Sequence, residues 1–251
     1  ETEIGYWQLS LSCDGISEAC KVLETPVTGG NVSLYNESKN KDNEITPINP
    51  TPVIGMVGKI DNIEKSVSSE WKNIDDQIWL IGSYKSETTI AASSYLEYFH
   101  GEITGRPPKI DLMDEKFCQG FLRNVIKKGY VISSHDVSDG GLAIALAESC
   151  ILAEKGATVE LQKDINRDDN LLFAEGGSRI VFSIDKLKVK EWLNYLKKVQ
   201  LNIPSSVYVK KIGFVSSETL KIKIQDKKIC NIRVEELTEK FNNTISAHFL
   251  I

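Results

Sequence analysis

The stretch Ser134-His-Asp-Val-Ser-Asp-Gly-Gly-Leu142 decides how the fold of this chain is interpreted. A short β-prone run, 130–133, precedes it, and an alanine-rich run with helical spacing, 142–152, follows it. Paired glycines between a strand and a helix allow the helix to pack closely behind the strand. The stretch therefore predicts a layered domain in which helices cover a β-sheet.

The same alternation of β-prone and helical runs continues on both sides. Strands are predicted at 78–82, 130–133, 157–161, 179–184, 207–214, 220–224 and 229–234, and helices at 88–99, 114–128, 142–152, 169–173, 187–199 and from 234 onward. In the second of these helices Asp114 is the expected N-cap and Gly129 the expected stop. The pattern predicts a layered α+β fold and neither a repeat nor a coiled coil.

The N-terminal residues follow a different pattern. A helix is expected to end at Leu23, with Asp14 or Ser17 as its N-cap. A β-prone stretch at 26–35 comes next, and a second strand is predicted at 53–60, after an exposed polar loop with several prolines.

A polar stretch, 66–76, is the best candidate for a boundary between domains. It divides the chain into a first region, 1–66, and a second, larger domain, 75–251. The chain begins with Glu1 and not with Met, so we expect it to be an excised piece of a longer protein.

Composition limits the class of function. Of the 251 residues, 41% are hydrophobic and 26% charged, which is typical of a globular protein, and the net charge of −5 argues against non-specific nucleic-acid binding. No apolar run approaches the roughly 18 residues of a membrane span. The five scattered cysteines form no C-x-x-C pair, which predicts neither a zinc site nor a disulfide framework and favours a reducing cytoplasm.

A first glycine motif, Pro26-Val-Thr-Gly-Gly-Asn-Val-Ser-Leu-Tyr-Asn36, carries the residue types needed to bind a phosphate. Gly29 and Gly30 allow the backbone to approach a ligand closely. Asn31 offers a neutral oxygen to Mg²⁺, and in a strand Ser33 points to the same face as Asn31. The motif either holds a metal-bound phosphate or forms a bulge at a strand corner.

The second motif, at 134–142, has two interpretations. Asp136, Ser138 and Asp139 either cluster around one ligand or belong to a structural turn. In the structural interpretation Ser138 or Asp139 caps the following helix, and Gly140 and Gly141 permit tight packing. Taken alone, the motif favours the structural interpretation, and the acidic pair is assigned no catalytic role.

A third glycine turn, Glu175-Gly-Gly-Ser-Arg179, leads into a predicted strand. It faces the same ligand, or else Arg179 pairs with Glu175 across the turn. Of the three histidines only His135 adjoins a motif, and without a serine or cysteine partner it is expected to be structural. Neither a Walker A motif nor a G-x-G-x-x-G fingerprint is present, so ATP would bind through another architecture.

Together these motifs resemble the second half of phosphoribosylformylglycinamidine synthase, and the resemblance spans almost the whole chain. The matching segments are Gly29-Gly-Asn-Val-Ser-Leu-Tyr-Asn-Glu37, Pro50-Thr-Pro-Val-Ile-Gly-Met-Val-Gly58, His135-Asp-Val-Ser-Asp-Gly-Gly-Leu142 with Ala147-Glu148-Ser149, and Leu172-Phe-Ala-Glu-Gly-Gly-Ser-Arg179. The last segment departs from the family pattern at Ala174 and Gly176.

The resemblance implies an aminoimidazole ribonucleotide synthetase-like architecture. The chain would hold the end of an N-terminal domain of that type, followed by a complete C-terminal α/β domain with a mixed sheet. It also implies that Gly30 contacts ATP, that Asn31 ligates Mg²⁺ and that Ser33 binds formylglycinamide ribonucleotide. No catalytic residue is assigned to this chain, because the family's general base lies in the first half.

The implied reaction is ATP-dependent conversion of formylglycinamide ribonucleotide into formylglycinamidine ribonucleotide, a step of purine biosynthesis. Ammonia would come from a glutaminase subunit or domain, with or without a small bridging subunit, and the first half of the synthetase would complete the enzyme. We expect the chain alone to be inactive.

Two other interpretations remain open from the sequence. The chain belongs to another ATP-using member of the same superfamily, such as aminoimidazole ribonucleotide synthetase, or it serves mainly as a structural nucleotide-binding and subunit-contact half. A Gly-Asn-Val-Ser-Leu-Tyr-Asn stretch at 30–36 favours the synthase over its superfamily relatives.

Overall fold

The computed structural model describes residues 2–31, 37–163 and 167–249, and for 244–249 the backbone alone. The chain divides into two compact units, Glu1–Asp61 and Asn62–Ile251. Each unit is described by itself.

The first unit begins with a long helix, α1 (Glu3–Leu23). Its N-cap is Thr2, whose hydroxyl accepts the backbone N–H of Gly5 at 3.1 Å. The expected cap at Asp14 or Ser17 is therefore wrong, because an uninterrupted run without proline extends the helix back to the first cap residue available. The expected end at Leu23 is confirmed, and Glu24 follows it in the left-handed conformation.

Two short strands, β1 (Glu37–Lys39) and β2 (Ile45–Pro47), form an antiparallel hairpin in the first unit. The strand predicted at 53–60 is absent, and Val53 is 92% exposed there. A β-prone sequence forms a strand only beside a partner, and no described residue of this unit pairs with it. The predicted stretch at 26–35 is irregular up to Asn31, and 32–36 lies outside the described residues.

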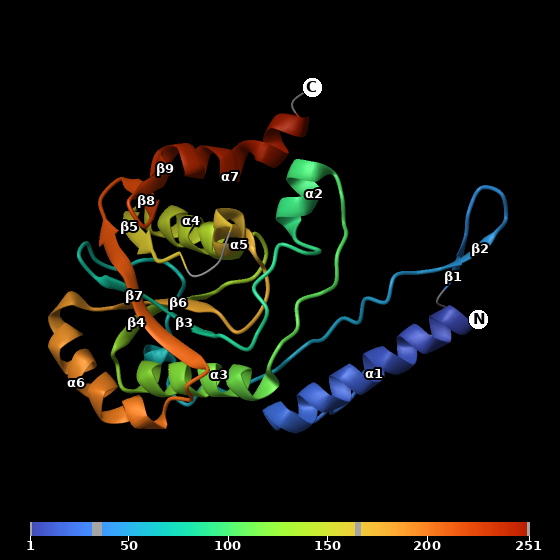
Figure 1. Ribbon diagram of the computed structural model, residues 1–251, viewed down its shortest axis with the longest axis horizontal. Coiled ribbons are helices and arrows are strands. Elements are labelled where there is room, and N and C mark those ends of the chain that lie inside the picture. The colour runs from blue at the N-terminus through green and yellow to red at the C-terminus, as the bar shows by residue number, and fades with distance from the viewer. Residues whose placement is uncertain (1, 32–36, 164–166, 250–251) are drawn as a thin grey trace. The chain divides into compact units, whose positions relative to one another are not determined.

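The second unit is built on a seven-stranded sheet with the order β4-β6-β3-β7-β5-β8-β9 (Figure 1). Its strands are β3 (Gln77–Ser83), β4 (Val131–Asp136), β5 (Gly156–Leu161), β6 (Ile180–Ile184), β7 (Val207–Ser216), β8 (Thr219–Ile224) and β9 (Lys227–Arg233). The β5–β8 pair is parallel and the other pairs are antiparallel. The predicted mixed sheet and its seven strands are thus confirmed.

Six α-helices and three short 3₁₀ turns belong to the described part of this unit. They are α2 (Ser94–His100), α3 (Leu112–Lys127), α4 (Gly141–Ala153), α5 (Asp168–Phe173), α6 (Val189–Val199) and α7 (Val234–Phe249), with η1 (Ile63–Lys65), η2 (Lys186–Lys188) and η3 (Gln200–Asn202). The helix predicted at 88–99 begins later, since Ser93 caps it. The N-cap of α3 is Asp111 and not Asp114, whereas the predicted stop at Gly129 is confirmed by its φ of +73°.

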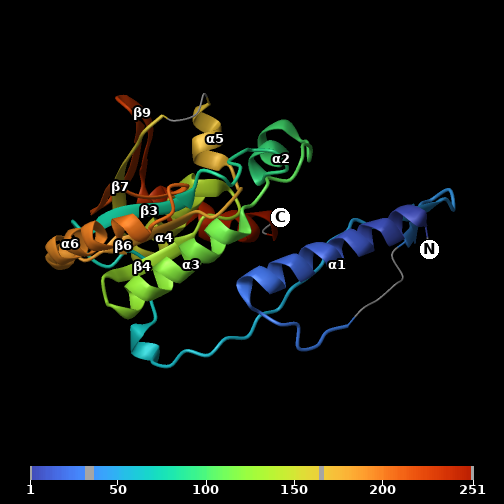
Figure 2. The ribbon, with the colours of Figure 1, turned by 60° about the horizontal axis from the view of Figure 1, so that its bottom comes forward.

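At β3 the sheet is covered on both faces, and the sequence of this strand shows how. Ile78 and Leu80 belong to one core with residues of α4, α5 and α7. Trp79 and Ile81 belong to a second core with residues of α3 and α6. Figure 2 shows α3 and α6 together along one side of the strands. Successive side chains of a strand point to opposite faces, so the continuous apolar run of β3 matches a strand with two covered faces.

Candidate functional site

The first glycine motif lies in an exposed, irregular stretch after α1. A Cβ added at Gly29 or Gly30 would meet no atom of the described residues within 4 Å, and Asn31 is exposed. The backbone and the amide oxygen of Asn31 are therefore open to a ligand, and an amide oxygen suits Mg²⁺. Ser33 lies in 32–36, outside the described residues. The three expected site residues remain predictions.

The second motif forms the turn from β4 into α4, as predicted. Gly140 and Gly141 have φ values of +74° and +72°, which only glycine adopts readily. Gly140 itself is the N-cap of α4, so the expected cap at Ser138 or Asp139 is wrong. The N–H of Gly140 instead donates to Oε1 of Glu175, at 2.7 Å.

Glu175 belongs to the third motif and brings two helix starts together. The same Oε1 accepts the backbone N–H of Ser94, at 2.9 Å, in the first turn of α2. A carboxylate at a helix N-terminus is stabilised by the exposed N–H groups and by the helix dipole. The place where α4 would attract an anion is thus taken by a carboxylate of the protein itself.

Arg179 does not pair with Glu175, which is one of the two interpretations that the sequence leaves open for this turn. Its guanidinium is 5% exposed and donates to the carbonyl oxygens of Gly176, at 3.2 Å, and Ala174. Burial lowers the pKa of this guanidinium, because a low-dielectric surrounding disfavours its charge. Arg179 therefore holds the turn that presents Glu175.

The glycines of the second and third motifs lie against neighbouring protein atoms and not against open space. A Cβ on Gly141 would come within 2.6 Å of the carbonyl oxygen of Ala174. On Gly176 it would come within 2.2 Å of the carbonyl oxygen of Glu87. These distances are far below van der Waals contact, so the glycines are needed for close packing. The structural interpretation of the second motif is confirmed in this respect.

His135 is held at both ring nitrogens. Nδ1 lies 2.7 Å from the carbonyl oxygen of Asp136, and Nε2 lies 3.0 Å from a carboxylate oxygen of Glu148 on α4. These contacts tie the end of β4 to the helix behind it, which supports the structural role expected for this histidine.

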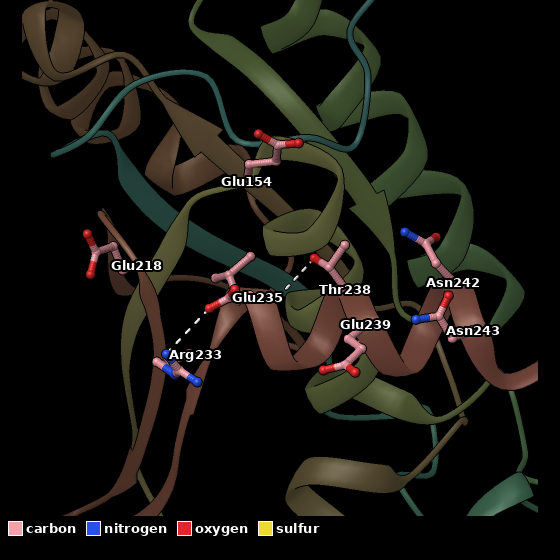
Figure 3. A pocket seen from close by; sticks show the side chains of 9 residues that line it. Glu154, Glu218, Arg233, Glu235, Thr238, Glu239, Asn242 and Asn243 are labelled. Carbon is pink, nitrogen blue, oxygen red and sulfur yellow. Dashed lines mark hydrogen bonds and ion pairs between the residues drawn. The ribbon is translucent and has the colours of Figure 1, made fainter. Parts of the chain in front are cut away.

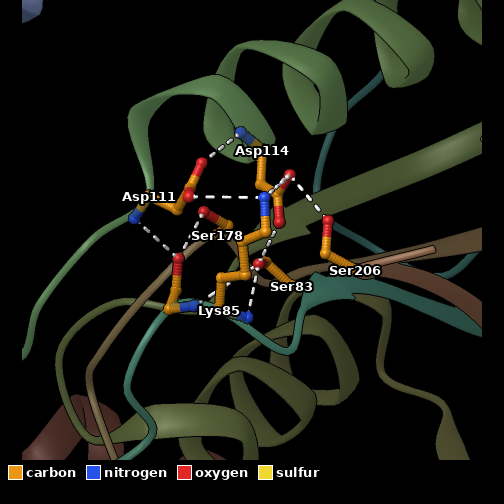
Figure 4. A network of polar contacts seen from close by, with 7 residues as sticks. Ser83, Lys85, Asp111, Asp114, Ser178 and Ser206 are labelled. Atoms are coloured by element: carbon orange, nitrogen blue, oxygen red, sulfur yellow. Dashed lines mark hydrogen bonds and ion pairs between the residues drawn. The ribbon is translucent and has the colours of Figure 1, made fainter. Parts of the chain in front are cut away.

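A buried polar network, which the sequence did not reveal, joins the end of β3 to the start of α3 (Figure 4). At its centre is Asp114, 3% exposed, which accepts the hydroxyls of Ser83 at 2.6 Å and Ser206 at 2.9 Å. Lys85 Nζ lies 3.9 Å from this carboxylate and 3.7 Å from that of Asp111. The backbone N–H of Asp114 and the charge of Lys85 lower the pKa of Asp111.

Ser86 and Ser178 connect this network to the third motif. Ser86 Oγ accepts the backbone N–H of Asp111 at 3.1 Å and lies 3.3 Å from Ser178 Oγ. In the sequence, this network shows only as small polar residues after a buried strand. Asp114 is predicted there as a helix cap, whereas in the structure it is the acceptor shared by Ser83 and Ser206.

A hollow of about 660 Å³ lies at the start of α7 (Figure 3). Four glutamates line it, and its one arginine, Arg233, is bonded to Glu236 at 2.8 Å. Its charge therefore disfavours a phosphate. In the described ranges, no group of three or more His, Cys, Asp or Glu residues is placed to hold a metal ion.

None of the helices described is long and apolar enough to cross a membrane.

The second unit, a mixed sheet covered by helices, lies in a part of the chain that matches a known protein family. A family model described as "AIR synthase related protein, C-terminal domain" matches residues 73–219, and the chain belongs to this family.

Among individual proteins, the chain is similar to the phosphoribosylformylglycinamidine synthase subunit PurL of Prochlorococcus marinus. Identity is 84% to that of strain MIT 9301 and 82% to that of strain MIT 9312, in each case over 99% of this chain and 32% of the relative. The chain thus spans about a third of the length of these curated relatives. They confirm the resemblance inferred from the motifs.

A solved structure of PurL from Thermotoga maritima, complexed with FGAR, has the same fold. It aligns with a TM-score of 0.59 and 16% identity, covering 89% of this chain and 36% of that one. At this identity the likeness supports the architecture alone. The expected layered fold with a mixed sheet is confirmed.

Proposed function

We propose that this chain forms the C-terminal part of a phosphoribosylformylglycinamidine synthase. This ligase uses ATP to convert formylglycinamide ribonucleotide into formylglycinamidine ribonucleotide, with ammonia derived from glutamine. The observation that carries the proposal is the 84% identity to a PurL subunit across 99% of the chain. The partners proposed are the first half of the synthetase, a glutaminase and, where present, a small bridging subunit, in the cytoplasm.

The first region, 1–66, would carry the ligand contacts. Gly30 would contact ATP, Asn31 would ligate Mg²⁺, and Ser33 would bind the ribonucleotide. The openness around Gly30 and the exposed amide of Asn31 support these roles. Bound Mg²⁺ would neutralise phosphate charge. This chain's own residues would position the phosphates and the amide that reacts.

The second domain, 75–251, would act as the scaffold of this half. The glycines of its motifs are packed against neighbouring protein atoms, and Glu175 accepts the N–H of Gly140, which argues against a phosphate cradle at either motif. This favours the structural interpretation for the domain, while the chemistry of the intact enzyme would depend on the first motif and on the other half.

The test is ammonia-dependent amidine formation by the intact parent protein. Asn31→Ala and Ser33→Ala are compared with Asn49→Ala, an exposed asparagine outside any helix or strand of the same unit. We expect activity to fall at least 100-fold in the first two variants, as for the loss of a group that stabilises transition-state charge. The control should keep the activity of the native protein.

Unchanged activity in Asn31→Ala and Ser33→Ala, with the fold retained, would refute the site assignment. Absence of the reaction from the intact parent would refute the proposed function as a whole. The purified chain should show no turnover, and measurable turnover by the chain alone would contradict the expected division of labour.

A further inference from the structure

The helical layer formed by α3 and α6 has a charge opposite to that of the rest of the chain. Residues 112–129 and 185–203 contain nine lysines and arginines and four acidic residues, a net charge of +5. The whole chain has a net charge of −5, so the remaining residues carry −10. A surface of one sign on a protein of the other sign steers a partner of complementary charge to that surface.

An apolar groove runs between these two helices, which lie side by side in Figures 1 and 2. It encloses about 420 Å³. Phe117, Gly120 and Phe121 of α3 line one wall of the groove. The other wall includes Tyr195, Val199 and Ile203. From Phe117 to Asn124 the groove follows two turns of α3, enough to receive the apolar face of one short helix.

Gly120 lies at the middle of the groove, and the packing of the described residues does not require a glycine there. It occupies the interior of α3 with an ordinary helical φ. A Cβ there would meet only the end of Arg123, at 3.9 Å. Glycine is among the poorest helix formers, so its presence indicates close approach by something outside the domain.

The rim of the groove combines aromatic surface with fixed donors and positive charge. The amide of Asn124 donates to the hydroxyl of Tyr195 at 3.0 Å, which holds the ring in place. Lys128 Nζ lies 5.6 Å from the centre of the same ring. Lys116 lines the groove, and Lys198 is exposed on α6. An apolar floor with a cationic rim fits an amphipathic helix with acidic flanks.

We propose that the α3–α6 groove docks an acidic amphipathic helix of another polypeptide. The apolar side chains of that helix would lie over Gly120 and against Phe117 and Tyr195. Its glutamates or aspartates would lie beside Lys116, Lys128 and Lys198.

The experiment measures binding of a synthetic helical peptide of about 15 residues by fluorescence anisotropy, using the full chain. The peptide carries leucines on one face and glutamates on the flanks, and a matched peptide carries lysines in place of the glutamates. We expect the acidic peptide to bind at least about tenfold more tightly, with affinity that falls as salt rises.

Two variants with matched controls locate the site. Gly120→Leu fills the groove and should weaken binding about tenfold, while the improved helix propensity keeps the melting temperature at or above that of the native chain. Gly15→Leu is the control, because Gly15 is also inside a helix and a Cβ there meets nothing within 4 Å. It should not change binding.

Charge reversal tests the rim. Lys116→Glu combined with Lys198→Glu should weaken binding of the acidic peptide about fivefold and reduce its salt dependence. The same change at Lys221 and Lys223, which are exposed on β8, should leave it unchanged.

Three outcomes would overturn the proposal. The first is no saturable binding of the acidic peptide up to about 1 mM. The second is equal binding by native chain and Gly120→Leu. The third is preferential binding of a single-stranded oligouridine at this face, which would make it a nucleic-acid surface.

Discussion

Removal of the Glu175 carboxylate should destabilise the second unit by an amount that the geometry predicts. In Glu175→Ala the N–H of Gly140 loses an acceptor at 2.7 Å in a partly buried position, which costs about 1.5 kcal/mol. The N–H of Ser94 is exposed and donates to water once the carboxylate is removed, at a cost of about 0.5 kcal/mol. The expected loss is therefore about 2 kcal/mol, or about 4–8 °C in melting temperature.

Glu175→Gln separates the charge from the hydrogen bond. The amide oxygen still accepts an N–H, and only the interaction of a negative charge with the helix N-terminus is lost, about 0.5 kcal/mol. Urea unfolding of both variants is compared with that of Glu102→Ala, a change at an exposed loop carboxylate. The reasoning would be refuted if Glu175→Ala matched this control, or if Glu175→Gln lost as much as Glu175→Ala.

Three other predictions concern buried groups. Cys118 and Cys150, whose pKa values burial raises to about 12, should resist iodoacetamide at neutral pH while exposed Cys13 reacts; equal labelling of the native chain would contradict this. Asp114→Ala should cost about 3 kcal/mol in urea unfolding, because it strands two serine hydroxyls, and a loss below about 1 kcal/mol would show that the network adds little. Burial raises the pKa of Asp76 above its ordinary 3.8, so folding favours the protonated form of this carboxyl. As pH rises from 3.8 through the raised pKa, the native chain should therefore lose stability relative to Asp76→Asn. A stability difference between the two proteins that does not change with pH would argue against this.

The sheet of the second unit was predictable because its signals are local. Strands such as β3 and β6 are short apolar runs, and Gly129 marks the end of α3 by its positive φ. The strand predicted at 53–60 failed because its residues supply propensity but no partner strand. Pairing is a non-local property that a single stretch cannot encode.

The polar connections were not predictable from spacing. Asp111 and Asp114 are both plausible caps three residues apart, and the path of the chain after β3 decides between them by burying Asp114 against Ser83. Glu175 contacts residues 35 and 81 positions away in the sequence. Such contacts depend on which loops meet at one end of the sheet, and that becomes visible only when the strand order is known.

The glycine pairs look alike in sequence, and their surroundings separate them. Among the described residues no atom lies within 4 Å of a Cβ added at Gly30, whereas around Gly141 and Gly176 backbone oxygens lie within 2.6 Å and 2.2 Å. The first glycine pair leaves space that a ligand can fill, whereas the space beside the other glycines is filled by neighbouring protein atoms. Since Glu175 also neutralises the start of α4, a phosphate would have to displace a carboxylate that the fold itself positions. The open backbone at Gly30 therefore fits the proposal that the nucleotide contacts of this chain lie in the first motif, whereas the glycines of the second unit serve packing.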